Sequence, residues 1–193
     1  PQSPSNQFSG LSNNTRLSHA KGVIDTRKPP CYSRTCPVRI THPFTRKSTV
    51  GLAIIDDQSG VTFVSPHIKR LLTIPESSIE ASTQSVITIE GPSSPRPCEI
   101  IHNLVVSPLT GNSEIILPPS VMQNPIPNAL DQIPSPSDVA QMKGFSHFAE
   151  HFPEKDPDWP TLLLIGRDCM AAQWQQQYWS NDNLPLMVVE TPL

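Results

Sequence analysis

The 193-residue chain is poor in glycine, aromatic residues and charge. Glycine occurs only 8 times, aromatic residues make up 6 % of the chain, and charged residues make up 16 %. The scarcity of glycine excludes a collagen-like repeat, which needs glycine at every third position. No apolar run approaches the roughly 20 residues that a membrane-spanning helix requires, and no heptad pattern is present. We therefore expect neither a fibrous protein nor a membrane partner.

Proline, by contrast, is abundant, with 23 residues. An interior proline removes a helical hydrogen bond and clashes with the preceding turn, so long helices are not expected. The apolar residues instead form short runs that end at turn residues, which is typical of strands. Many short strands without alternating long helices predict an all-β (β-dominated) barrel. The predicted strands span residues 49–55, 61–64, 85–89, 98–106, 114–117, 161–165 and 186–189.

Charge divides the chain into two parts. Residues 1–50 hold eight of the 14 Lys and Arg residues and a single acidic residue, Asp25. We interpret residues 1–48 as a basic, disordered leader, since they have few apolar side chains to bury, and residues 49–193 as the folded domain. The leader is most simply a solvated linker, and contact with nucleic-acid phosphates is the alternative. The first 30 residues lack the apolar segment of a secretory signal, so we expect an intracellular, cytoplasmic protein.

The four cysteines are widely spaced and do not form the dense framework of a small disulfide scaffold. Cys31 and Cys36, together with His42, supply only three clustered candidate ligands. Their spacing also fits structural zinc poorly, because such sites use closer cysteine pairs and a second ligand pair. Zinc is therefore the minor alternative, and we expect no metal and no cofactor.

Four further features are predicted to shape the domain. Residues 65–72 predict one or two helical turns, with Ser65 as the N-cap and a proline at the first helical position. Residues 118–160 are rich in proline and predict a covering arm with one or two short helices. The composition of residues 169–179 predicts another helix. The strands 85–89 and 98–106 are expected to form a hairpin with a long tip.

One ordered pair of motifs carries chemistry. The strand 49–55 runs into Asp56, and the strand 161–165 runs into Gly166-Arg167-Asp168 and then a predicted helix. This order resembles the retropepsin-like aspartic protease family, and more closely the peptidase region of Pao-type (BEL/Pao) retrotransposon polyproteins. The resemblance implies an acid-protease barrel subunit with the hairpin at about 86–106 as a flap over the substrate. The matching stretches, within residues 49–193, are 53–59, 62–65, 115–118 and 163–168.

Aspartic proteolysis needs two carboxylates about 3 Å apart that share one proton. One acts as the base on a bound water while the other donates a proton to the scissile carbonyl. This chain has a single strand-to-Asp turn of the right kind, so a working site needs two chains related by a twofold axis. We therefore expect a homodimeric aspartic endopeptidase that acts on polypeptides, with Asp56 as the catalytic residue. The resemblance implies that five further residues support the site: Asp57, Gln58, Ser59, Arg167 and Asp168.

The turn departs from the family pattern, which is Asp-Ser/Thr-Gly. Asp57 stands where the small hydroxyl is expected, and it adds negative charge near a pair of carboxylates that already repel each other. Gln58 stands where glycine is expected, and glycine alone lets the backbone approach closely and adopt unusual dihedral angles. The alternative function is therefore an inactive, domesticated copy that serves as a dimerisation or scaffold module. A third, weaker hypothesis is a nucleic-acid-binding fragment that uses residues 16–47.

Overall fold

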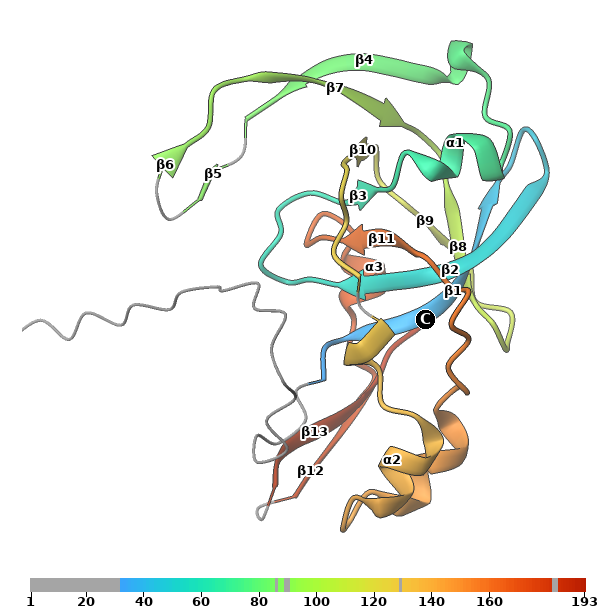
Figure 1. The fold of residues 1–193 in the computed structure, drawn as a ribbon, viewed down its shortest axis with the longest axis vertical. Helices are drawn as coiled ribbons and strands as arrows, with labels where there is room; N and C mark the ends of the chain where they lie inside the picture. Colours follow the sequence, from blue (N-terminus) through green and yellow to red (C-terminus); the bar gives the residue numbers. More distant parts are fainter. Residues whose placement is uncertain (1–31, 86, 89–90, 129, 182–183) are drawn as a thin grey trace, which may run out of the picture. The chain divides into compact units, whose positions relative to one another are not determined.

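The computed structural model describes residues 32–193, except residues 86, 89–90, 129 and 182–183 (Figure 1). Within that part of the chain, nine strands form one large, curled, mixed sheet, which confirms the predicted dominance of β-structure. The strands are β1 (Thr35–His42), β2 (Lys47–Ile55), β3 (Phe63–Val64), β4 (Ile79–Gln84), β7 (Arg96–Ile101), β8 (Val105–Pro108), β9 (Ile115–Ile116), β10 (Ser120–Met122) and β11 (Thr161–Ile165). Their order in the sheet is β4-β7-β10-β3-β11-β2-β1-β8-β9.

Smaller elements surround this sheet. Two separate antiparallel pairs are formed by β5 (Ile87–Thr88) with β6 (Gly91–Pro92), and by β12 (Gln177–Asn181) with β13 (Leu184–Glu190). The α-helices are α1 (His67–Leu71), α2 (Pro136–Gln141) and α3 (Met170–Gln173), and the 3-10 helices are η1 (Glu76–Ser78), η2 (Leu130–Gln132) and η3 (Ser146–His151). All are short, as the proline content predicts. Among the described residues, no helix has the length and apolar character that crossing a membrane requires.

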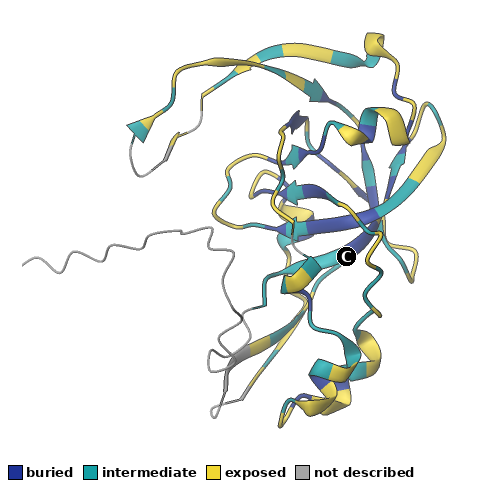
Figure 2. Cartoon of the chain, viewed as in Figure 1, coloured by how far each residue is buried: buried dark blue, intermediate teal, exposed yellow. Residues whose placement is uncertain are grey.

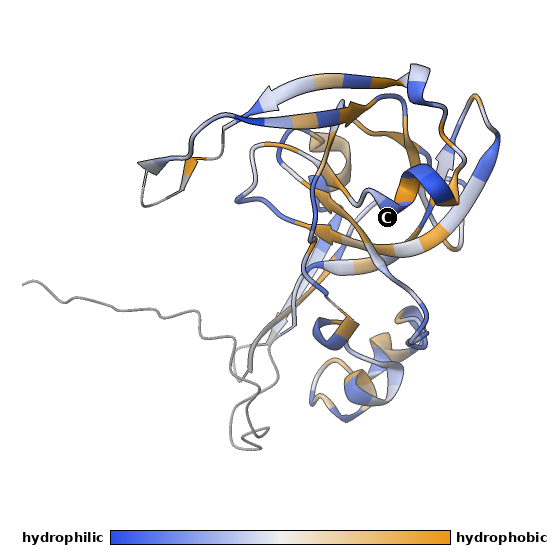
Figure 3. Cartoon of the chain, turned by 45° about the horizontal axis from the view of Figure 1, so that its top comes forward, coloured by the Kyte–Doolittle hydropathy of each residue, from blue (hydrophilic) through white to orange (hydrophobic). Residues whose placement is uncertain are grey.

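The hydrophobic core lies in the middle of the large sheet. Figure 2 shows the buried residues concentrated in its central strands, and Figure 3 shows the hydrophobic residues gathered in the same region. In β1 the buried side chains alternate with more exposed ones, so that Val38 and Ile40 are fully buried while Arg39 is exposed. This alternation is expected, because successive side chains of a strand point to opposite faces of the sheet.

The folded part begins well before residue 49. Strand β1 lies inside the predicted leader and pairs along its whole length with β2, from Thr35 opposite Ile54 to His42 opposite Lys47. The basic residues in and around β1 concealed it, because they lower the mean hydropathy of a strand whose other face is buried. Residues 1–31 of the predicted leader lie outside the described residues.

A hairpin lies near the predicted place, but its first strand is β4, upstream of the predicted strand 85–89. Strand β4 pairs with β7, from Ile79 opposite Ile101 to Gln84 opposite Arg96, and β5 and β6 form the tip. The predicted strand 98–106 is in fact two strands, because the chain turns at Asn103, where φ is 60°. After this turn β8 pairs with β1 instead of continuing the hairpin.

The predicted helix at 169–179 is also shorter than expected. Helix α3 ends at Gln173, and the chain then forms β12, which pairs with β13.

The predicted arm at 118–160 does contain short helices. Its helix α2 begins at a capping box in which the Ser135 hydroxyl accepts a hydrogen bond from the Asp138 amide, while the Asp138 carboxylate accepts one from the Ser135 amide.

Candidate functional site

The parallel pairing of β2 and β11 brings the two chemically distinctive motifs together. Ile55 ends β2 and lies opposite Ile165, which ends β11. The next residue, Asp56, donates its amide hydrogen to the Ile165 carbonyl oxygen at 2.9 Å. Because parallel strands end at the same edge of a sheet, the loop after β2 and the turn after β11 emerge side by side. We call residues 56–61 the Asp56 loop.

The Asp56 loop is closed by its own hydrogen bonds. The Asp56 carboxylate accepts a hydrogen bond from the Gln58 amide at 2.9 Å, which is the geometry of an Asx turn. The Asp57 carboxylate accepts one from the Gln58 side-chain amide at 3.1 Å, and the Ser59 hydroxyl donates to the Val61 carbonyl at 2.7 Å. Asp56 and Ser59 are half-buried, whereas Asp57 and Gln58 are exposed. Side-chain hydrogen bonds thus hold a turn that has no glycine at its third position.

A second set of contacts joins Thr62, the residue after this loop, to the turn that follows β11. We call these contacts the Asp168 clamp. The two carboxylate oxygens of Asp168 accept hydrogen bonds from the Thr62 hydroxyl at 2.7 Å and from the Thr62 amide at 2.9 Å. The Thr62 hydroxyl in turn accepts a hydrogen bond from the Gly166 amide at 3.2 Å. Thr62 is fully buried, so these partners satisfy polar groups that water does not reach.

The backbone of the turn after β11 is equally close to the Asp56 loop. The Arg167 amide donates a hydrogen bond to the Ser59 carbonyl at 2.8 Å. A Cβ atom on Gly166 would lie 2.6 Å from the Val61 carbonyl oxygen, so only glycine fits there. The structure therefore brings all six sequence-predicted site residues together at one edge of the sheet. Arg167 bonds to the Asp56 loop through Ser59, and Asp168 bonds to Thr62 at its end.

Arg34 joins this assembly, although sequence analysis assigned it to the leader. Its carbonyl oxygen accepts a hydrogen bond from the Ile55 amide at 2.7 Å, directly before Asp56. Its guanidinium lies with Nη1 4.0 Å from the Asp57 carboxylate and donates from Nη2 to the Gln173 carbonyl at 3.4 Å. No local pattern marks Arg34 as a site residue, because its contacts come from segments that are distant in the sequence.

The β4–β7 hairpin is the candidate flap. Figure 1 shows its tip projecting beyond the sheet on the side where the chain passes from β2 to β3. Ile87 at the tip is 82 % exposed. An exposed apolar side chain at the end of a long hairpin is available to contact a bound segment.

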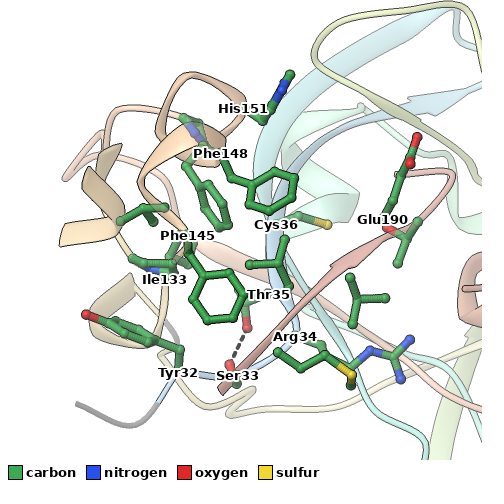
Figure 4. A pocket seen from close by; sticks show the side chains of 18 of the residues that line it. Tyr32, Ser33, Arg34, Thr35, Cys36, Ile133, Phe145, Phe148, His151 and Glu190 are labelled. Carbon is green, nitrogen blue, oxygen red and sulfur yellow. Dashed lines mark hydrogen bonds between the residues drawn. The ribbon is translucent and has the colours of Figure 1, made fainter. Parts of the chain in front are cut away.

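A cavity of about 670 Å³ lies between the start of β1, the arm and the β12–β13 hairpin (Figure 4). Its walls are largely apolar, and the rings of Phe148 and Trp179 pack there with centroids 4.7 Å apart. Arg34 and Ile55 also line the cavity, so its wall reaches the base of the Asp56 loop. A cavity of this size and lining falls within the range of small-molecule sites.

Of the three candidate zinc ligands, Cys36 and His42 lie in the part of the chain that the structure describes, and Cys31 lies outside it. Among the described residues no group of three or more potential metal ligands occurs. Burial raises the pKa of the Cys36 thiol to about 12. His42 is buried, which lowers its pKa, and its Nδ1 accepts a hydrogen bond from the Thr45 amide at 3.3 Å. Its role is therefore to hold the β1–β2 turn.

Comparison of the chain with protein-family models, with curated proteins and with solved structures finds no match. The functional argument therefore depends on the geometry of the chain itself.

Proposed function

We propose that this chain is one subunit of a homodimeric, retropepsin-like aspartic endopeptidase in which each chain contributes Asp56. The single observation that carries the proposal is the junction of β2 with β11. There, Asp56 donates its amide to Ile165, and Asp168 holds the far end of the same loop through Thr62. This arrangement fixes a carboxylate at a strand end, as preorganised acid–base catalysis requires.

The chemistry explains why two chains are needed. A lone carboxylate cannot both activate a water and protonate the scissile carbonyl, so two must face each other and share a proton. A twofold axis through the Asp56 loops would supply the second carboxylate. The β4–β7 hairpin of each chain would then cover an extended peptide. The resemblance to Pao-type peptidases points to a retroelement polyprotein as the class of origin.

One observation favours an inactive scaffold module as the second candidate. The neighbouring Asp57 and Gln58 side chains hydrogen-bond to each other, in place of the hydroxyl and glycine of the family pattern. In this alternative the chain dimerises without cutting peptides.

A cleavage assay separates the two candidates. Wild type, Asp56→Asn and Asp131→Asn are incubated with a random peptide library at pH 4 to 6, and products are identified by mass spectrometry. Asp131 is an exposed residue of η2 and serves as the matched control. The protease proposal expects cleavage by wild type and Asp131→Asn and none by Asp56→Asn. Equal cleavage by all three proteins would disprove it.

If wild type does not cut, the double variant Asp57→Ser/Gln58→Gly distinguishes the remaining outcomes. Cleavage that appears only in this variant supports the scaffold candidate, because restoring the family turn restores the chemistry. Sedimentation of wild type then shows whether the chain dimerises. A monomer at all concentrations contradicts both candidates.

A further inference from the structure

Arg34 occupies a position that the chemistry described so far does not use. Its backbone carbonyl binds the amide of Ile55, the last residue before Asp56. Its guanidinium forms an ion pair with Asp57, with Nη1 4.0 Å from the carboxylate, and it also donates a hydrogen bond to the carbonyl of Gln173 at the end of α3. Gln173 in turn connects Arg34 to β11. Its side-chain amide donates a hydrogen bond to the Ile165 carbonyl at 3.1 Å, and the same oxygen accepts the hydrogen bond of the Asp56 amide.

Arg34 and Gln173 also carry polar atoms without hydrogen-bond partners. Among the described residues, the two buried side-chain polar atoms that lack a partner are Nε of Arg34 and Oε1 of Gln173. One is a donor and the other an acceptor, and they belong to two residues that already touch. Buried polar groups without partners are rare in folded proteins. Both atoms belong to the two residues that link the start of β1 to α3.

The negative charge of the Asp56 loop is what Arg34 offsets. The exposed Asp57 carboxylate adds one negative charge beside Asp56, and in a dimer each loop would bring two carboxylates to the same axis. Arg167 follows β11, and its side chain lies near Gly60 of the same loop, where a Cβ would be 3.8 Å from Nη2. Among the described residues, the cation paired with Asp57 is Arg34.

We propose that Arg34 is the positioning residue of the Asp56 loop: its guanidinium offsets the charge of Asp57 and ties the loop to α3 through Gln173. Arg34 thereby makes an Asp-Asp turn compatible with the approach of a second such loop. This role depends on the proposed function only for its consequence in the dimer. Its effect on the loop exists within a single chain.

Amide hydrogen exchange of the Asp56 loop tests the role of Arg34. The amide of Gln58 is the reporter, because its acceptor is the Asp56 carboxylate. In 0.02 M salt at pH 7, Arg34→Met should speed exchange of this amide up to about fivefold, the range of a partly exposed ion pair. The increase should shrink in 0.5 M salt, because salt screens charge pairs. Arg39→Met is the control, since Arg39 lies five residues further along the chain, in β1, and its side chain is exposed.

Two further variants distinguish charge from packing. Arg34→Lys keeps the charge and loses the forked guanidinium, so it should fall between wild type and Arg34→Met. Asp57→Asn in the Arg34→Met background should restore slow exchange, since the charge that needs offsetting is gone. Exchange in Arg34→Met that equals Arg39→Met, or that Asp57→Asn does not restore, overturns the proposal.

Cleavage and self-association, measured on the same variants, keep this inference separate from the proposed function. Fast exchange in Arg34→Met with a wild type that neither cuts nor dimerises would mean that the proposed function fails while the role of Arg34 stands. Cleavage that depends on Asp56, together with unchanged exchange in Arg34→Met, would mean the reverse. If both proposals hold, Arg34→Met should also dimerise more weakly than Arg39→Met at low salt.

Discussion

The Asp56 loop and the arm (residues 118–160), which packs against the β12–β13 hairpin, are held in different ways. The Asp56 loop is fixed by hydrogen bonds from the Asp56 amide to the Ile165 carbonyl and from the Arg167 amide to the Ser59 carbonyl. The residue after the loop, the buried Thr62, is held by its two hydrogen bonds to Asp168. The arm is held against the β12–β13 hairpin by aromatic contacts, such as that of Phe148 with Trp179, around a cavity of about 670 Å³. Directional bonds specify one geometry, whereas apolar contacts beside a cavity allow several. The backbone geometry is thus more tightly specified at the Asp56 loop than in the arm.

The largest effect is expected from breaking the Asp168 clamp. Asp168→Ala removes the acceptor of both the amide and the hydroxyl of Thr62, which are buried, so the free energy of unfolding should fall by about 2–3 kcal/mol. Urea denaturation measures the change, with the exposed Asp158→Ala as the control. If the two variants have the same midpoint, the clamp does not hold the loop, and the contrast between the two regions disappears.

A smaller effect is expected from the arm. Phe148→Ala removes the ring that packs on Trp179, but part of that ring faces a cavity rather than close-packed atoms. The loss should be about 1–2 kcal/mol, below the 3–5 kcal/mol of a phenylalanine in a fully packed core. Denaturation of Phe148→Ala is compared with that of Phe44→Ala, whose ring is 75 % exposed. A loss as large as that of Asp168→Ala would show that the arm is packed as tightly as the Asp56 loop.

A prediction on chemical reactivity, separate from the two on stability, concerns the Cys36 thiol in the cavity wall. Because burial raises its pKa to about 12, the thiolate is scarce at pH 8. Iodoacetamide should therefore label Cys36 far more slowly than Cys98, as measured by peptide mass spectrometry in a Cys31→Ser background. Comparable rates would mean that the arm opens readily and exposes the cavity.

The same thiol predicts a dependence of stability on pH. The folded pKa lies above the ordinary value of 9.0, so the folded chain keeps a proton that the unfolded chain has already lost. The contribution of Cys36 to stability is complete below pH 9 and is lost as the pH rises toward about 12. Cys36→Ala should make this part of the stability profile flatter.

How far the sequence predicts the structure depends on how local the signal is. The sequence predicts the strand at 161–165 at its observed bounds, and the one at 49–55 to within two residues, because each is an apolar run closed by turn residues. It does not predict β4, because Ile79–Gln84 has polar side chains on both faces and no periodic apolar pattern. The predicted helix at 169–179 is too long, because pairing with β13 overrides local helix propensity after Gln173.

The candidate site divides in the same way. Asp56, Arg167 and Asp168 were singled out from the sequence because they follow apolar strands at turn positions. Arg34 was not, since its partners Asp57 and Gln173 come from other parts of the chain. A contact between segments leaves no local signature when the residues that make it are polar and ordinary in their surroundings.

Local preferences account for the short helices, the strands formed by apolar runs, and the prolines that lie between them. Proline excludes interior helix, and apolar runs between turn residues favour strands. Long-range pairing, by contrast, sets β2 parallel to β11, brings β1 into the sheet and places Arg34 against the Asp56 loop. An apolar run specifies that a strand is buried, but its neighbours are chosen by packing across the whole sheet.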